Sequence, residues 1–230
     1  MKIHGLLKMT LLDFPGRVAC TVFLAGCDFR CPFCHNYDLA CGKSPAVMES
    51  EELFAFLKKR QGLLDGVAVT GGEPCLHPGL HDLMTKIRSL GYAIKLDTNG
   101  YHPELLERLF REDLVDYVAM DIKNSPEKYA ETVGRDSLDL TPIRKSIDLL
   151  MRSRTPFEFR TTVVAEFHEA SDFEKIGKMI EGAPLYFLQC FTDRDTVPYE
   201  NLHAPSAKEL RLYAEIAGRY VGCAAVRGVD

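Results

Sequence analysis

Three cysteines within eight residues are the part of this sequence best suited to chemistry. Cys27, Cys31 and Cys34 are spaced as C-x3-C-x2-C inside the stretch AGCDFRCPFCHN. Three thiolates in this arrangement can hold three irons of a four-iron, four-sulfur cluster and leave the fourth iron free for an outside ligand. The alternative is a structural zinc site, in which His35 or Cys41 completes a set of four ligands. The spacing favours iron, because Cys34 and His35 are adjacent and make an awkward chelating pair.

The glycine-containing stretch TGGEP is the second candidate for chemistry. Gly71 and Gly72 carry no Cβ, so a ligand can lie directly against the backbone. Glu73 supplies a carboxylate where an ammonium group could bind. The alternative is a plain turn between a strand and a helix, punctuated by glycine and proline. Its position one predicted strand after the three cysteines favours a binding role.

The composition indicates a globular protein of the cytoplasm. The 230 residues are 46% hydrophobic and 27% charged, with a net charge of -5, which argues against a nucleic-acid-binding surface. No run approaches the roughly 20 apolar residues of a membrane span. The apolar opening MKIHGLLKMTLL is followed by Asp13, Pro15 and Arg17 and shows no signal-peptide cleavage site. The eight cysteines are clustered, which in a reducing compartment indicates metal binding or catalysis.

Short apolar runs alternate with helical patterns along nearly the whole chain. We expect six strands, at 18–25, 66–70, 93–97, 117–121, 157–164 and 184–191. This alternation predicts an α/β fold with parallel strands and right-handed crossovers, as an open doubly wound sheet or a curved partial barrel. No linker or repeat interrupts the pattern, so we expect one domain over residues 1–230, with core strands over about 18–191 and a C-terminal helix near 206–221.

Several helix starts can be predicted from capping residues. Thr141 precedes a proline at the start of one helical pattern. Ser171 with Glu174, and Ser206 with Glu209, have the spacing of capping boxes ahead of two more helices.

Polar clusters follow four successive predicted strands. The cysteines follow the first strand and TGGEP the second, while DTNG closes the third and MDIKN the fourth. Functional residues of parallel barrels gather where strands end and loops begin. We therefore expect these four clusters to converge on one site, and this convergence favours the partial barrel.

The C-x3-C-x2-C spacing after the first strand, with GGE after the second, resembles the radical S-adenosylmethionine (SAM) enzymes. This resemblance implies the partial (βα)6 barrel and a [4Fe–4S] cluster held by Cys27, Cys31 and Cys34. It also implies that SAM chelates the open iron through its amino and carboxylate groups. One electron from the cluster would then cleave SAM to methionine and a 5′-deoxyadenosyl radical.

The same resemblance assigns roles to the residues around the cluster. Gly71, Gly72 and Glu73 would meet the amino group of the methionine portion of SAM. Phe33 and the backbone at His35 would lie near the adenine.

Asp97 and Asp121 end neighbouring strands, where both would face the carboxylate of bound SAM. Three negative groups in a partly desolvated site repel one another, so positive charge must offset them. Lys123 and Arg160 are the candidate side chains, and a monovalent cation assisted by Thr98 is another candidate. The alternative for Asp97 is an Asx turn into the Asn-Gly pair that follows.

Finer matches favour one branch of the radical SAM enzymes. CHN at the third cysteine, DTNG and MDIKN resemble the activating enzymes of glycyl-radical proteins, and LLDFPGRVACTVFLAGC is most similar to the activating protein of anaerobic ribonucleoside-triphosphate reductase. The resemblance spans about residues 10–125 and implies two partners: a glycyl-radical enzyme, and a flavodoxin or ferredoxin as reductant. Two alternatives stay open, a small-molecule radical SAM enzyme like the deazapurine synthases and a zinc-stabilised binding module.

Overall fold

The computed structural model describes residues 1–229, and its centre is one curved sheet of eight strands. The six central strands are β3 (Ala19–Leu24), β5 (Gly66–Gly71), β6 (Ala93–Thr98), β7 (Tyr117–Asp121), β8 (Phe157–Val163) and β9 (Tyr186–Cys190). They pair in this order and are all parallel. The prediction of six parallel strands is therefore confirmed. Val67, Val69, Ile94, Leu96 and Val118 are fully buried, as strands covered on both faces require.

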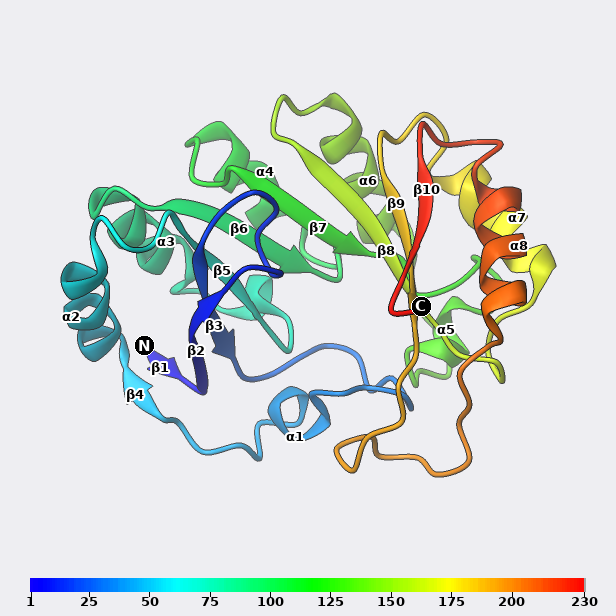
Figure 1. Cartoon of the computed structure of the whole chain (residues 1–230), viewed down its shortest axis with the longest axis horizontal. Helices are drawn as coiled ribbons and strands as arrows, with labels where there is room; N and C mark the ends of the chain where they lie inside the picture. Colours follow the sequence, from blue (N-terminus) through cyan, green and yellow to red (C-terminus); the bar gives the residue numbers. More distant parts are fainter. Residues whose placement is uncertain (230) are drawn as a thin grey trace.

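Two further strands extend the sheet at its edges. β2 (Gly5–Thr10) pairs antiparallel with β3, and β10 (Ala224–Arg227) pairs parallel with β9. Among residues 1–229 these two edge strands do not pair with each other, so the sheet bends into an arc without closing (Figure 1). A separate two-stranded ribbon joins β1 (Lys2–Ile3) to β4 (Met48–Glu49). The fold is an open, mostly parallel α/β arrangement that matches the predicted partial barrel.

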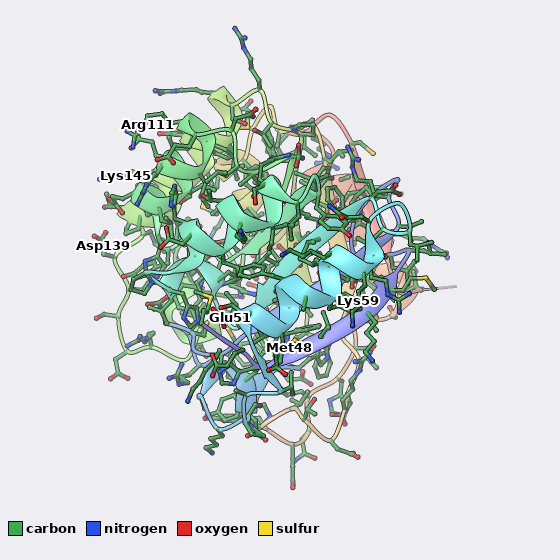
Figure 2. All side chains as sticks on the ribbon, turned by 90° about the vertical axis from the view of Figure 1, so that its left-hand side faces the viewer. Met48, Glu51, Lys59, Arg111, Asp139 and Lys145 are labelled. Carbon is green, nitrogen blue, oxygen red and sulfur yellow. The ribbon has the colours of Figure 1, made fainter. Side chains whose placement is uncertain are left out.

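Helices flank the sheet along the arc. They are α1 (Tyr37–Ala40), α2 (Ser50–Arg60), the 3-10 turn η1 (Pro74–Leu76), α3 (Leu80–Ser89), α4 (Pro103–Arg111), α5 (Tyr129–Thr132), α6 (Thr141–Arg152), α7 (Ala170–Met179) and α8 (Ala207–Ala217). Figure 1 shows the longer ones running from α2 and α3 at the left to α7 and α8 at the right. Charged residues such as Glu51, Lys59, Arg111 and Lys145 lie on the outward faces of these helices (Figure 2). No helix among the described residues combines the length and apolar character needed to cross a membrane.

The capping predictions have mixed outcomes. Ser206 caps α8 with Glu209 in a reciprocal box, as predicted. The box predicted at Ser171 is wrong, because α7 starts at Ala170 and is capped by Glu169 with Asp172. Asp172 is fully buried and accepts hydrogen bonds from Ser125 and Lys128. These contacts fix the start of the helix at Ala170, one residue before Ser171. The last helix ends at Ala217, before the predicted boundary near 221.

Candidate active site

One cavity of about 230 Å³ opens at the carboxyl ends of the central strands. It is lined by Cys27, Phe29, Cys31, Phe33, Cys34, His35, Asn36, Ala40, Thr70, Gly71, Gly72, Asp97, Thr98, Asn99, Asp121, Lys123, Arg160, Thr162 and Gln189. The four predicted polar clusters therefore do meet at one mouth. Of the residues predicted for the site, Glu73 alone is absent from this lining.

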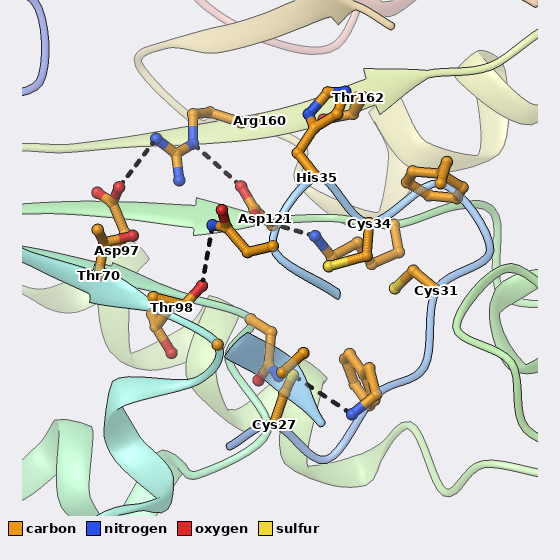
Figure 3. A pocket seen from close by; sticks show the side chains of 18 of the residues that line it. Cys27, Cys31, Cys34, His35, Thr70, Asp97, Thr98, Asp121, Arg160 and Thr162 are labelled. Atoms are coloured by element: carbon orange, nitrogen blue, oxygen red, sulfur yellow. Dashed lines mark hydrogen bonds and ion pairs between the residues drawn. The ribbon is translucent and has the colours of Figure 1, made fainter. Parts of the chain in front are cut away.

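The three cysteines form one wall of the cavity, on the loop that follows β3 (Figure 3). Burial raises the pKa of the Cys27 thiol to about 11 and that of Cys31 to about 12, so both are protonated until a metal replaces the proton. The Phe29 N–H donates to Cys27 Sγ at 3.4 Å, and the Asn99 side-chain amide donates to the same sulfur at 3.8 Å. These donors would stabilise a thiolate on the cavity side.

The donor set fits a cluster held by three cysteines. All eight cysteines are free, but Cys20, Cys41, Cys75, Cys190 and Cys223 lie outside the cavity lining. Three irons can therefore take protein thiolates while the fourth iron faces the open cavity.

The zinc alternative has no geometric support. Between Met1 and Val229 no three His, Cys, Asp or Glu side chains lie close enough together to hold a single metal ion. The ring of His35 is otherwise engaged, because its Nε2 lies 2.6 Å from the Thr192 carbonyl and the ring stacks on Phe191 with the centroids 5.5 Å apart. Neither His35 nor any other described side chain therefore completes a zinc site with the three cysteines.

The two glycines of TGGEP are required by the protein's own backbone. Gly71 has φ +131°, and a Cβ there would lie 2.1 Å from the Leu24 carbonyl oxygen. A Cβ at Gly72 would lie 2.0 Å from the Gly26 oxygen. The Gly72 N–H donates to Leu24 O at 2.9 Å, and the next N–H donates to Gly26 O at 2.8 Å. The two glycines therefore allow the end of β5 to pack directly against the start of the cysteine loop. They also line the cavity without a side chain that would fill it.

Glu73 points away from the cavity into the protein. Its side chain is fully buried, and its carboxylate accepts hydrogen bonds from Cys75 N at 2.9 Å, Thr98 Oγ1 at 2.8 Å and Asn99 N at 2.6 Å. Burial raises the pKa of Glu73, while these three donors act in the opposite direction. The carboxylate connects the turn after β5 to the turn after β6. A direct contact between Glu73 and SAM stays a prediction, and this geometry gives the carboxylate a structural role.

The acidic strand ends lie in a network of paired charges. Arg160 lies between Asp97 and Asp121, with Nε 3.0 Å from Asp121 Oδ1 and Nη1 3.5 Å from Asp97 Oδ2 (Figure 3). Lys123 donates to Asp121 at 2.9 Å, and Lys95 pairs with Asp97. Burial alone would raise the pKa of Asp121, but Lys123 and Arg160 lower it to about 2. Lys123 and Arg160 therefore offset the negative charge of the two aspartates, as predicted, and Lys95 adds a third positive charge.

The Asx-turn alternative for Asp97 is wrong. The turn after β6 is made by the following residues, because Gly100 N donates to Thr98 Oγ1 at 3.1 Å and Tyr101 N donates to Asn99 Oδ1 at 2.9 Å. Asp97 instead lines the cavity with its carboxylate in the charge network.

Phe33 and Lys123 share a buried support that the sequence did not indicate. The Phe33 ring packs against Phe167 and His168, with centroids 5.6 and 6.5 Å away. His168 accepts from Val164 N at 3.2 Å through Nδ1 and donates from Nε2 to the Lys123 carbonyl at 2.9 Å. Burial lowers the pKa of His168, which favours the neutral ring that this pattern requires.

Sequence reasoning assigned no role to several residues in the cavity lining or paired with it, and strand alternation could have found three of them. Lys95 precedes Asp97 by two residues on β6, and Thr162 follows Arg160 by two on β8, so each pair shares a face. Gln189 lies opposite Thr162 on the neighbouring strand β9. Asn36, which donates to Gly71 O at 3.3 Å, belongs to the CHN stretch, but no strand pattern indicated its role.

Comparison with known proteins agrees with this geometry. Residues 21–176 match the family model of the Radical SAM superfamily. A Methanocaldococcus jannaschii protein named as a glycyl-radical enzyme activating enzyme is 31% identical over 99% of this chain and 96% of its own. A pyruvate formate-lyase-activating enzyme from Listeria monocytogenes is 26% identical over 94% of this chain and 89% of its own.

A solved structure supports the fold. Streptococcus suis SuiB bound to S-adenosylmethionine superposes with a TM-score of 0.68 and 12% identity over 91% of this chain. This chain spans 52% of that protein, and at this identity the likeness concerns the fold alone. The family match covers the three cysteines, the glycine turn and the charged strand ends in one stretch. The chain therefore belongs to the radical SAM superfamily.

Proposed function

We propose that this enzyme is an activating enzyme that generates a glycyl radical on a partner protein. The observation that carries the proposal is that the three-cysteine wall, the glycine turn and the Asp97–Arg160–Asp121 network line one cavity. The two relatives described above, which match 94% or more of the chain, carry the names of activating enzymes, and this supports a protein substrate over a small molecule.

In this proposal Cys27, Cys31 and Cys34 hold a [4Fe–4S] cluster, and SAM occupies the rest of the cavity. When bound, the cluster supplies the electron for reductive cleavage of SAM to methionine and a 5′-deoxyadenosyl radical. Lys123 and Arg160 provide positive charge for the carboxylate of SAM, and their pKa values are raised by the neighbouring carboxylates against the effect of burial. Both side chains therefore stay cationic at neutral pH.

The other residues that line the cavity suit the two ends of SAM, the adenine and the amino group. Phe33, which is 4% exposed, and His35 form the apolar wall suited to adenine. The backbone carbonyl oxygens of the Gly71–Gly72 turn are acceptors that suit the amino group, whereas the Gly72 N–H already donates to Leu24 O. Binding of the adenosyl group beside the buried Phe33 would keep water away from the 5′-deoxyadenosyl radical. It would also orient the radical toward the open side of the sheet.

The partner we propose is anaerobic ribonucleoside-triphosphate reductase, with a low-potential flavodoxin or ferredoxin as electron donor. The choice of reductase rests on the stretch LLDFPGRVACTVFLAGC. The free, clustered cysteines suit a reducing cytoplasm. A glycine Cα of the reductase would lose its hydrogen atom to the 5′-deoxyadenosyl radical, giving 5′-deoxyadenosine and a glycyl radical.

The predicted monovalent cation stays part of the proposal as a separate point. Lys95, Lys123 and Arg160 already lie at the two carboxylates, so the charge argument no longer requires a metal ion. SAM affinity measured in potassium, sodium and choline salts of equal ionic strength tests the point. Equal affinity in all three would contradict a cation site.

The decisive experiment combines the reconstituted protein with reductant, SAM and the candidate reductase under anaerobic conditions. A glycyl doublet in the electron paramagnetic resonance (EPR) spectrum of the reductase, with stoichiometric 5′-deoxyadenosine, is the expected result. Cys31→Ala should abolish the cluster and the doublet, whereas the matched variant Cys223→Ala, at an exposed cysteine outside the cavity, should retain both. A SAM-cleaving wild type that leaves reductase and pyruvate formate-lyase without a doublet would indicate a small-molecule enzyme.

A further inference from the structure

The turn that follows α5 lies directly against the cysteine loop. The Arg30 N–H donates to the Val133 carbonyl at 2.9 Å. Gly134 has φ +68°, and a Cβ there would lie 2.3 Å from the Arg30 carbonyl oxygen, so the two backbones touch. Arg135 then extends its guanidinium to the Asp28 carbonyl, with Nε at 3.0 Å and Nη2 as a second donor. An exposed arginine thus holds one carbonyl between two of the predicted cluster ligands.

The peptide unit that Arg135 holds is the one that donates to a cysteine sulfur. The Asp28 carbonyl and the Phe29 N–H belong to the same planar trans peptide and point in opposite directions. The Phe29 N–H donates to Cys27 Sγ at 3.4 Å. Two guanidinium donors on the one carbonyl oxygen therefore fix the orientation of the N–H at the sulfur end of the same peptide unit.

We propose that Arg135 is a positioning residue that fixes this N–H···S bond and thereby raises the reduction potential of the cluster at Cys27. The inference rests on the cluster assigned under the proposed function. Hydrogen bonds to ligand sulfur help to set the potential of iron–sulfur clusters. The reduced cluster carries one more negative charge, so a donor at its sulfur stabilises the reduced form and moves the potential in the positive direction.

Arg30 provides a matched control on the same loop. It is also exposed, and its Nη1 donates to the Cys27 and Phe29 carbonyls, each at 2.7 Å. Over the part of the chain that the structure describes, neither of those peptide units donates to a cysteine sulfur, and the Arg30 N–H itself goes to Val133. Arg30→Met therefore removes one positive charge beside the cluster and leaves the Asp28–Phe29 peptide unit held by Arg135.

The experiment is an EPR-monitored redox titration of the anaerobically reconstituted full chain, without SAM or partner. Arg135→Met should shift the midpoint potential further in the negative direction than Arg30→Met does. Arg135→Lys, which keeps the charge and one donor, should fall between Arg135→Met and wild type. Iron content and circular dichroism should match wild type, because both arginines are on the surface.

Two results would overturn the assignment of Arg135. Equal shifts in Arg135→Met and Arg30→Met would mean that charge alone acts, and an unshifted potential in Arg135→Met would remove the effect altogether. If Arg135→Met fails to retain four irons, the midpoint potential of Arg135→Lys is compared with that of wild type. An unshifted potential in Arg135→Lys then overturns the assignment. A wild type that binds no four-iron cluster would overturn the proposed function as well, whereas the first two results leave it standing.

Discussion

Replacing Glu73 by Gln tests whether this carboxylate organises the fold or binds the cofactor. The side chain is fully buried and accepts three hydrogen bonds, two at Oε1 from Cys75 N and Thr98 Oγ1 and one at Oε2 from Asn99 N. Gln can keep the two bonds at its oxygen. Its amide nitrogen would then face the Asn99 N–H, which places a donor against a donor. Of the two links between the turn after β5 and the end of β6, the one from Asn99 N would be lost and the one from Thr98 Oγ1 kept.

The expected cost follows from those contacts. A buried donor left without an acceptor costs about 1–3 kcal/mol, and a hydrogen bond to a charged group is worth about 1.5–3 kcal/mol. Burial raises the pKa of Glu73, so the neutral amide recovers part of this cost. We expect Glu73→Gln to lower the free energy of unfolding by about 1–3 kcal/mol. In a chain of this size each kcal/mol lowers Tm by about 2–4 °C.

The assay is thermal unfolding of the metal-free protein, followed by SAM affinity on the reconstituted enzyme. Glu104→Gln, at an exposed side chain on α4, controls for the loss of one negative charge and should leave Tm unchanged. The buried Glu73→Gln should lower Tm and weaken SAM binding only as far as the turn loosens. An unaltered Tm with a large loss of SAM affinity would refute this reasoning and place the carboxylate on the amino group of SAM.

Three further predictions test neighbouring parts of the site. Gly72→Ala would place its Cβ 2.0 Å from Gly26 O, so it should lower the free energy of unfolding by about 1–3 kcal/mol or more, measured by denaturant titration. The pKa of Asp121 is lowered from 3.8 to about 2, so its ionised carboxylate contributes about 2 kcal/mol to the free energy of unfolding above pH 3.8. This contribution is lost as the pH falls toward 2. Asp121→Asn should therefore make the free energy of unfolding less dependent on pH between 3.8 and 2. His168→Asn keeps an acceptor for Val164 but no donor to Lys123, whereas His168→Gln keeps that donor. SAM affinity should therefore fall roughly fivefold in the first variant only, and equal losses in both would contradict positioning through Lys123.

The parallel core and the convergence of the motifs could be predicted because both follow from local patterns. The four strands β3, β5, β6 and β7 are short and largely apolar, and each polar cluster comes directly after one of them, so parallel pairing brings the clusters to one edge. The edge strands lack this signal. β2 has the sequence GLLKMT with its side chains largely solvent-exposed, and β10 has four residues, all half-buried.

The direction of a side chain at a strand end was harder to predict than its position along the chain. Glu73 belongs to the predicted turn, but its backbone N–H donates to the Gly26 carbonyl. Its carboxylate consequently points into the protein interior, toward Asn99 N, and not into the cavity. Lys95 was overlooked because a lysine in a strand is usually exposed, yet it is 3% exposed and pairs with Asp97. His168 contributes through the fold alone, since its contacts to Lys123 and Phe33 join segments that no sequence pattern relates.

The charges at the cavity explain why the two carboxylates of Asp97 and Asp121 can lie close together. Asp97 and Asp121 face three cationic side chains, Lys95, Lys123 and Arg160, which leaves an excess of one positive charge in this group. An unpaired charge in a partly desolvated site favours a ligand of opposite sign, because pairing regains the Coulomb energy that desolvation removed. A single carboxylate, such as that of an amino acid, would neutralise the group. Because Arg160 already bridges both aspartates, such a ligand would bind without moving either strand end.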